Sequence, residues 1–90
     1  MSHYIALLLR SPVGEWNVVF PDVPECRAHG YTVDDATYAA MTALSRCAAE
    51  DGVSLRPPRD LVEIERDEEW LSRHNIDLSE AIVTMISLAA

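Results

Sequence analysis

The stretch from Trp16 to Ala36 (WNVVFPDVPECRAHGYTVDDA) constrains the fold more than any other part of the sequence. It opens with alternation, since Trp16, Val18 and Phe20 give one face of an extended segment bulky apolar side chains. Two prolines follow, and because proline fixes φ and cannot donate to a β-ladder, they predict a stiff turn. A more polar extended segment and a capped helix come next. The stretch therefore predicts the order strand, turn, strand, helix.

The segment Tyr4 to Leu9 (YIALLL) is apolar on both of its faces and carries no charge. Such a strand belongs in the middle of a sheet that is covered on both sides. The loop Ser11 to Glu15 (SPVGE) contains proline and glycine, which predicts a hairpin to the second strand. Arg27 to Thr32 is shorter and more polar, so we expect a third strand near the sheet edge.

The helix after this third strand has a clear start signal. Thr32 is a plausible N-cap, with Asp35 three residues later to complete a pair like a capping box. A stripe of mostly small residues then recurs at helical spacing, which lets a helix lie close on a sheet. Its members are Ala36, Ala40, Ala43, Leu44 and Cys47. Gly52 is available for the left-handed C-terminal conformation.

The second half of the chain begins with Arg56 to Arg59 (RPPR), a strong helix breaker that is too short to separate domains. Asp60 can then cap a helix, interrupted near Asp67, with apolar positions at Leu61, Ile64, Trp70 and Leu71. Ala81 to Leu88 is short and β-branched, which favours a strand. A right-handed crossover would lay that strand parallel to the first. The expected fold is α+β, in the order β-β-β-α-α-β with the main helix packed on a mixed sheet.

The composition agrees with one small domain. The chain has 90 residues, and its 49% apolar content excludes a disordered chain. No apolar run approaches the ~20 residues that span a bilayer. The apolar segment His3 to Leu9 lacks the basic start and small-residue cleavage site of a signal peptide, so a cytoplasmic protein is expected.

The turn and helix start together resemble the HicB family of antitoxins. In that family a strand ends in a Pro-Asp-x-Pro-Gly-Cys-like turn, and a helix start like Gly-x-Thr-x-x-Glu-Ala follows. The matching residues are Phe20, Pro21, Asp22, Val23, Pro24 and Cys26, then Gly30, Thr32, Asp34, Asp35 and Ala36. Two positions depart from the pattern, since Glu25 replaces the usual glycine and Asp35 a frequent glutamate.

By the order of elements this resemblance covers roughly residues 3 to 89. It implies a partial ribonuclease-H-like fold. We expect one HicB-like domain over residues 1–90, without a separate C-terminal DNA-binding domain.

The charge indicates a kind of partner. Fifteen acids oppose seven arginines, and a net charge of −8 repels nucleic acid phosphates and favours a basic protein. The acids concentrate between Asp60 and Glu80. One interpretation of this run is a solvated helix face, and the other is an electrostatic landing surface. The candidate contact residues on the second interpretation are Glu63, Glu65, Glu68 and Glu69.

The sequence offers no catalytic constellation. Ribonuclease-H-type nucleases need carboxylates around two metal ions, one of them in the first strand, and Tyr4 to Leu9 has none. The three histidines show no metal-ligand spacing, so no catalytic residue, metal ligand or cofactor is assigned. Cys26 lies near His29 in sequence but lacks an orienting third group, which favours a packing role. Cys26 and Cys47 are expected to be free thiols.

A binding function is therefore expected. HicB proteins pair with HicA toxins, small basic ribonucleases shaped like double-stranded-RNA-binding domains that cleave messenger RNA. The resemblance implies an antitoxin that binds a basic HicA-like toxin and covers its active surface. The alternative is a stand-alone oligomeric binding or regulatory module without a toxin. We also expect a dimer or higher even oligomer, formed through Ala81 to Leu88 or the sheet face opposite the main helix.

Overall fold

The computed structural model describes residues 2–50 and 58–88. In these ranges the strands are β1 (Ser2–Arg10), β2 (Trp16–Val19), β3 (Arg27–Gly30) and β4 (Ile82–Leu88). The helices are α1 (Val33–Ala49), α2 (Leu61–Glu65) and α3 (Glu68–Arg73), followed by the short 3₁₀ helix η1 (Leu78–Glu80).

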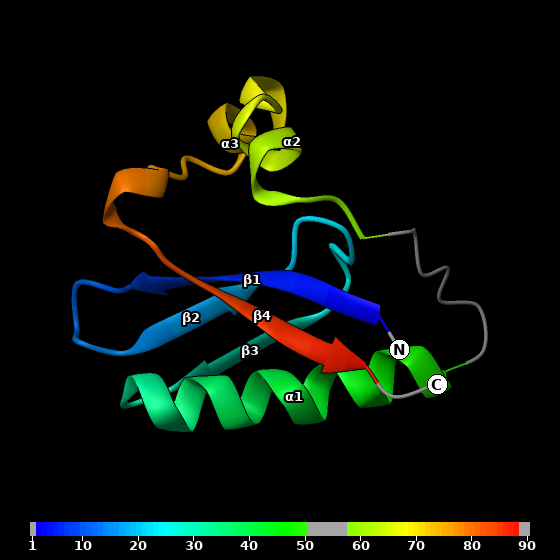
Figure 1. Cartoon of the computed structure of the whole chain (residues 1–90). Coiled ribbons are helices and arrows are strands. Elements are labelled where there is room, and N and C mark those ends of the chain that lie inside the picture. Colours follow the sequence, from blue (N-terminus) through cyan, green and yellow to red (C-terminus); the bar gives the residue numbers. More distant parts are fainter. Residues whose placement is uncertain (1, 51–57, 89–90) are drawn as a thin grey trace.

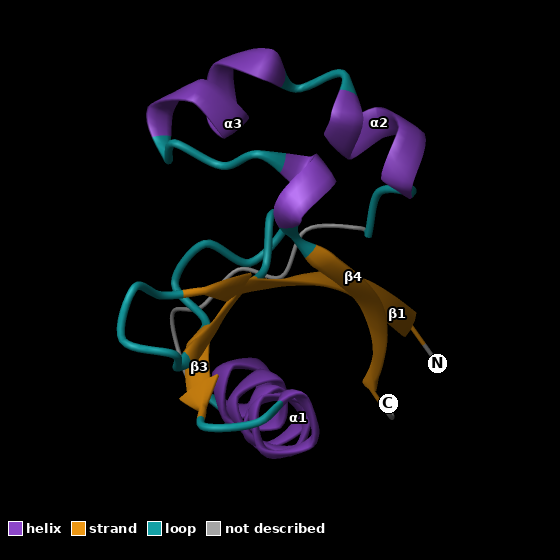
Figure 2. Cartoon of the chain, turned by 90° about the vertical axis from the view of Figure 1, so that its left-hand side faces the viewer, coloured by secondary structure: helices purple, strands orange, loops and turns teal. Residues whose placement is uncertain are grey.

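The strands form one sheet in the order β3-β2-β1-β4 (Figure 1). β1 is an internal strand and β3 an edge strand, as predicted. The predicted hairpin joins β1 to β2, and the backbone N–H of Ser11 donates to the carbonyl of Glu15 at 2.7 Å. Gly14 takes the left-handed conformation there, with φ of 91°. α1 covers one face of the sheet, while α2 and α3 lie over the other (Figure 2).

The prediction for the last strand was wrong in direction. β4 pairs with β1 antiparallel, with Leu8 opposite Ile82 and Ser2 opposite Leu88, so the sheet is antiparallel throughout instead of mixed. The reason is that the chain crosses the sheet lengthwise twice between β3 and β4. α1 takes it one way beneath the sheet, and the segment from α2 to η1 brings it back over the other face (Figure 1). The ribonuclease-H-like character stays a prediction.

α1 starts at its predicted N-cap, although of the expected capping-box pair with Asp35 only the bond to the Thr32 side chain is present. Thr32 is the N-cap, and its Oγ1 accepts the backbone N–H of Asp35 at 3.0 Å. The helix ends at Ala49, with Glu50 as an extended C-cap. The predicted role of Gly52 falls outside the described residues.

The small-residue stripe of α1 faces the sheet. Ala36, Ala40 and Leu44 have no exposed surface, and Ala43 and Cys47 pack against the same cluster. The close approach begins at Gly30, where a Cβ atom would lie only 2.7 Å from the backbone carbon of Asp35. The sheet side of this core consists of Tyr4, Ala6, Leu8, Val18, Phe20 and Ile86, among others.

The opposite face of β1 belongs to a second, smaller cluster. Ile5 and Leu7 from β1 pack with Ile64 from α2, and half-buried residues surround them: Val19, Leu61, Trp70, Ile76 and Leu78. Burying each large aliphatic side chain stabilises the fold by about 1.5–3 kcal/mol. β1 is thus covered on both faces, as its uniformly apolar sequence predicts.

Candidate partner-binding surface

The segment 58–80 forms a cap over the sheet face that α1 leaves free, and several of its acids start its helices. Asp60 and Glu63 form a full capping box on α2: the N–H of Glu63 donates to Asp60 Oδ1 at 2.8 Å, and the N–H of Asp60 donates to Glu63 Oε1 at 3.3 Å. Asp67 caps α3 by accepting the N–H of Trp70. The predicted interruption near Asp67 is confirmed.

All four acids predicted to meet a partner are exposed on α2 and α3: Glu63, Glu65, Glu68 and Glu69. They differ in what else they do. Glu63 belongs to the capping box, and Glu69 accepts from Arg73 at 2.6 Å on the open surface. Glu65 and Glu68 bind no other described side chain, which makes them the two whose charge is directed only at solvent or a partner.

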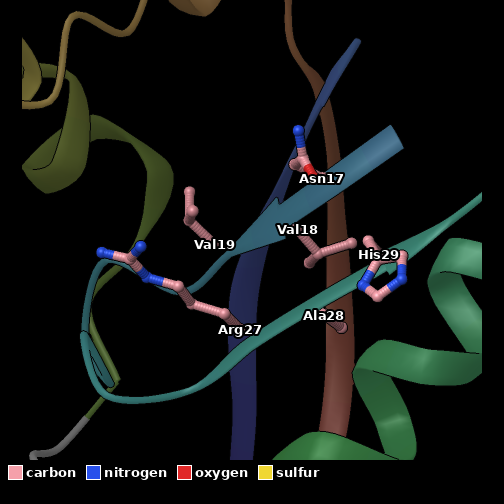
Figure 3. Close-up of a pocket in the computed structure, with 6 residues that line it drawn as sticks. All are labelled: Asn17, Val18, Val19, Arg27, Ala28 and His29. Carbon is pink, nitrogen blue, oxygen red and sulfur yellow. The ribbon is translucent and has the colours of Figure 1, made fainter. Parts of the chain in front are cut away.

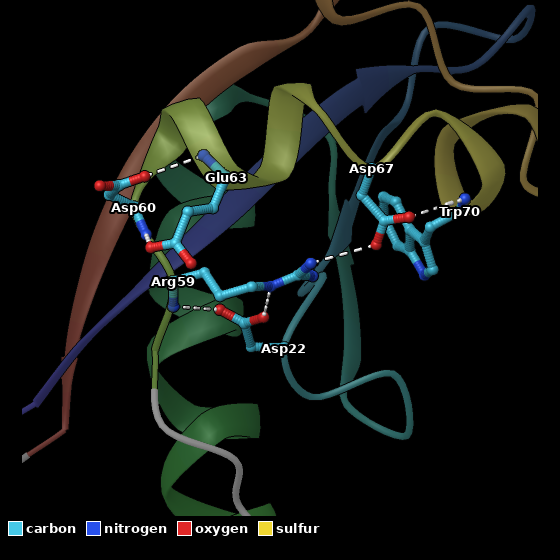
Figure 4. Close-up of polar contacts among 6 residues, drawn as sticks. All are labelled: Asp22, Arg59, Asp60, Glu63, Asp67 and Trp70. Atoms are coloured by element: carbon cyan, nitrogen blue, oxygen red, sulfur yellow. Dashed lines mark hydrogen bonds and ion pairs between the residues drawn. The ribbon is translucent and has the colours of Figure 1, made fainter.

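An ion pair between a buried carboxylate and a half-buried guanidinium fastens the cap to the turn after β2. Asp22 is 4% exposed, and its Oδ2 accepts the backbone N–H of Arg59 at 2.7 Å while its Oδ1 accepts Arg59 Nε at 2.5 Å (Figure 4). Arg59 Nη1 donates to Asp67 Oδ2 at 3.1 Å. One guanidinium therefore joins the β2–β3 turn, the entry to α2 and the N-cap of α3.

The environment of this ion network shifts two pKa values. Although burial works against the charged guanidinium, the hydrogen bonds to Asp22 and Asp67 raise the pKa of Arg59. The bond from Arg59, helped by the Trp70 N–H, lowers the pKa of Asp67. Sequence reasoning missed Arg59 and treated its segment only as a breaker. An acid in a turn and an arginine 37 residues later carry no periodic signal that pairs them.

The turn residues of the sequence motif serve packing and geometry. Phe20, Pro21 and Cys26 are buried, whereas Pro24 is exposed. Two backbone bonds shape the turn, from the N–H of Val23 to Phe20 at 3.1 Å and from the N–H of Cys26 to Val23 at 2.9 Å. The turn thus carries Asp22 beneath the surface while its chain bends toward β3.

Both cysteines are free thiols. Burial, and then a hydrogen bond with Cys47, raises the pKa of the Cys26 thiol to about 12. A thiol that stays protonated at neutral pH is a poor nucleophile.

The histidines occupy separate places. His3 forms a hydrogen bond with Ser87 at 2.8 Å, the His74 ring lies tilted by 42° against Trp70 with ring centroids 4.9 Å apart, and His29 is exposed on β3. Within residues 2–50 and 58–88, no three His, Cys, Asp or Glu side chains gather in a way that could hold a metal ion. No helix in the described part of the chain is long and apolar enough to cross a membrane.

Several solved structures share the fold of this chain. The N-terminal domain of the antitoxin HicB from Burkholderia pseudomallei superimposes with a TM-score of 0.73 and 17% identity, over 98% of this chain and 99% of that domain. A chain of a HicA3–HicB3 toxin–antitoxin complex matches with a TM-score of 0.67 and 21% identity, over 98% of this chain and 99% of the other. The fold is that of the HicB N-terminal domain.

The full Burkholderia pseudomallei HicB matches with a TM-score of 0.74 and 18% identity. This chain spans 63% of that longer protein. Compared by sequence alone, the chain matches no protein-family model and no curated protein. The fold is thus shared although about four in five residues differ.

Proposed function

We propose that this protein is an antitoxin that binds a HicA-type toxin and neutralises it by covering its active surface. The observation that carries the proposal is the HicB fold over 98% of the chain, one of whose matches is a chain from a toxin–antitoxin complex. The mechanism is occlusion by a folded surface. It requires no chemistry from the antitoxin.

The charge distribution supports a basic partner. The chain carries −8, and the cap presents exposed acids on α2 and α3, with Arg66 and Arg73 as the only arginines in residues 60–80. Exposed charges of this kind act mainly on the association rate, and salt screens them over about 10 Å at 0.1 M. We therefore propose the cap acids Glu63, Glu65, Glu68 and Glu69 as a steering surface for the toxin.

The direct test is coexpression with the candidate toxin, a short basic open reading frame containing a histidine beside this gene. Expression of that frame alone should arrest growth and degrade messenger RNA, and coexpression of this protein should restore both while forming a copurifying complex. An intact complex without any rescue would contradict occlusion. Absence of both the complex and the rescue would contradict the proposal that this protein neutralises that toxin.

The steering role has a matched test in two double variants. Glu65→Gln/Glu68→Gln removes two exposed charges of α2 and α3 that bind no other described side chain, and Asp34→Asn/Glu50→Gln removes two exposed charges at the ends of α1, on the opposite face of the sheet. The first should slow toxin association severalfold at low salt and hardly at all near 1 M salt, where the Debye length is about 3 Å. Equal slowing by the control pair would reduce the cap acids to a solvated face.

The proposal also excludes nuclease activity. The purified protein should cleave neither RNA nor DNA with Mg²⁺ or Mn²⁺, since the central strand β1 contains no carboxylate. Cleavage that persists through repurification and is lost in Asp22→Asn would contradict the absence of nuclease activity.

The 90-residue polypeptide should also bind its promoter DNA weakly, because its charge of −8 repels phosphate. Sequence-specific, salt-resistant binding in a gel shift would contradict that expectation.

One observation supports the alternative of a self-assembling module. β4 is an uncharged edge strand, and its side chains Ile82, Val83 and Met85 are 38%, 37% and 60% exposed. An edge without charges pairs readily with another strand. We propose that β4 joins two copies into a dimer. Light scattering at tens of micromolar should give the wild type twice the monomer mass. The Met85→Lys variant should have the mass of a monomer. A monomeric wild type would contradict the dimer.

A further inference from the structure

The other edge of the sheet, along β3, differs from β4 in charge and surroundings. Two hollows meet there and share Arg27, Ala28 and His29. One of about 460 Å³ lies over β2 and β3, with Asn17 and Val19 on its β2 side (Figure 3). The other, of about 420 Å³, lies between β3 and α1. Successive residues of a strand point to opposite faces of the sheet. Since Arg27, Ala28 and His29 all line both hollows, the hollows lie along the outer edge of β3.

This edge is free in the described part of the chain. β3 is the outermost strand, and the backbone of residues 27–29 makes no hydrogen bond outside its ladder with β2. α1 supplies a second wall with one of its faces, formed by Tyr38, Ala39, Thr42, Ala43 and Arg46. That wall extends about 12 Å at 1.5 Å per residue, the length of about four extended residues. β3 itself has four residues.

The chemistry of the two walls is asymmetric. Val19 pairs with Arg27 and packs in the cap-side cluster, so Arg27 and His29 lie on the cap side of β3. Ala28 lies on the α1 side, in the α1 core cluster. A strand added at this edge would therefore meet two basic side chains on one face. On its other face it would meet Ala39 and Ala43, small side chains with room for apolar partners.

The basic side chains of the groove have no partner inside the described chain. Arg27, His29 and Arg46 are exposed and form no ion pair with another described residue, unlike Arg59 and Arg73. Two unpaired arginines beside a histidine, on a protein of charge −8, point to an anionic ligand. A second copy cannot supply it as a strand, because β1 to β4 contain neither Asp nor Glu.

We propose that the β3–α1 groove binds an extended acidic segment of another protein as a fifth strand. Adding a strand to a free edge beside a helix uses the main chain for affinity and alternate side chains for specificity. Opposite charges across neighbouring strands are favourable, so carboxylates should face Arg27 and His29 while β-branched residues face α1. The preferred pattern is therefore an alternation of Glu and Val.

The probe is a fluorescein-labelled peptide Thr-Glu-Val-Glu-Val-Thr, titrated with the intact protein. Saturable binding is expected at about 1 mM or below, with amide chemical-shift changes confined to β3 and α1. A peptide with Lys in place of Glu should not bind. A peptide of the same composition with adjacent Glu and adjacent Val should bind at least tenfold more weakly, because it breaks the alternation.

Charge variants complete the test. Arg27→Gln/His29→Gln removes the two side chains that face the carboxylates and should weaken binding of the Glu-Val peptide at least tenfold, whereas Arg66→Gln, which changes an exposed arginine of the cap, should leave binding unchanged. Circular dichroism establishes that each variant is folded. Shift changes located elsewhere, equal loss in Arg66→Gln, or stronger binding of single-stranded oligouridylate than of the peptide would each overturn the proposal. Since the probe needs no toxin, the antitoxin role can fail without affecting the result.

Discussion

α1 and the cap cover opposite faces of one sheet but are attached to it by different interactions. α1 lies close on the sheet through alanines and Gly30, in a cluster without a charged member. The cap contributes one fully buried aliphatic side chain, Ile64, and is tied down by the Asp22–Arg59–Asp67 network. Close apolar packing responds little to pH and to the screening of charges by salt, whereas an ion network depends on both. The cap should therefore open under conditions that leave the α1 layer intact.

The largest loss of stability is expected from placing a side chain at Gly30, where α1 lies closest to the sheet. In Gly30→Ala the new Cβ would meet the backbone of Asp35 and Ala36 at under 3 Å, and backbone cannot move aside cheaply. We expect a loss of about 3 kcal/mol in the free energy of unfolding, measured by chemical denaturation.

The matched control is Gly14→Ala, where nothing lies within 4 Å and only the positive φ resists the substitution. It should cost about 1 kcal/mol. Equal losses at the two glycines would mean that α1 is not closely packed at Gly30.

The next effect is expected at the cap. Arg59→Met leaves the Asp22 carboxylate buried with a single backbone donor, and should cost about 2 kcal/mol, below the usual 3–5 because Arg59 is 29% exposed. Hydrogen exchange should speed up in α2 and α3 before α1. Arg73→Met, which breaks an exposed pair, should change stability by under about 0.5 kcal/mol. Uniform acceleration across the domain would show that the two layers open together.

Acid should act on the cap in the same direction but more weakly. The pKa of Asp67 lies below its ordinary value of 3.8, so its contribution is present above that pH and disappears as pH falls through the lowered value. Stability of the wild type should drop below about pH 4 more steeply than that of Asp67→Asn. Parallel pH profiles for the two proteins would mean that Asp67 does not stabilise the cap through the Asp22–Arg59–Asp67 network.

The smallest effect is on thiol chemistry and does not change stability. At neutral pH one thiol should react promptly with an aromatic disulfide reagent, that of half-buried Cys47, while Cys26 reacts only on unfolding because its pKa is about 12. Cys47→Ser should abolish the prompt phase. A prompt phase that survives in Cys47→Ser would mean that the α1 layer opens readily near Cys26.

The α1 layer could be predicted almost completely from sequence and the cap only in part. Periodicity and capping are local signals, so the stripe from Ala36 to Cys47 and the Thr32 cap were visible in the pattern. The Asp22–Arg59 pair is not local, and the RPPR segment drew attention to its prolines. The direction of β4 depended on how far the cap carries the chain along the sheet, which no residue pattern encodes.

The pairing of β1 with β4 has a consequence for the time order of folding. Partners in this ladder are at least 74 residues apart, from Leu8 and Ile82 outward. Contacts between such distant residues form slowly, because the chain must first lose the entropy of the long loop between them. Only then do the contacts compensate for that loss. On a ribosome, β1, β2, β3 and α1 emerge well before β4. Until β4 arrives, the most apolar strand of the sheet has an open side, and a nascent chain is then most exposed to aggregation and proteolysis.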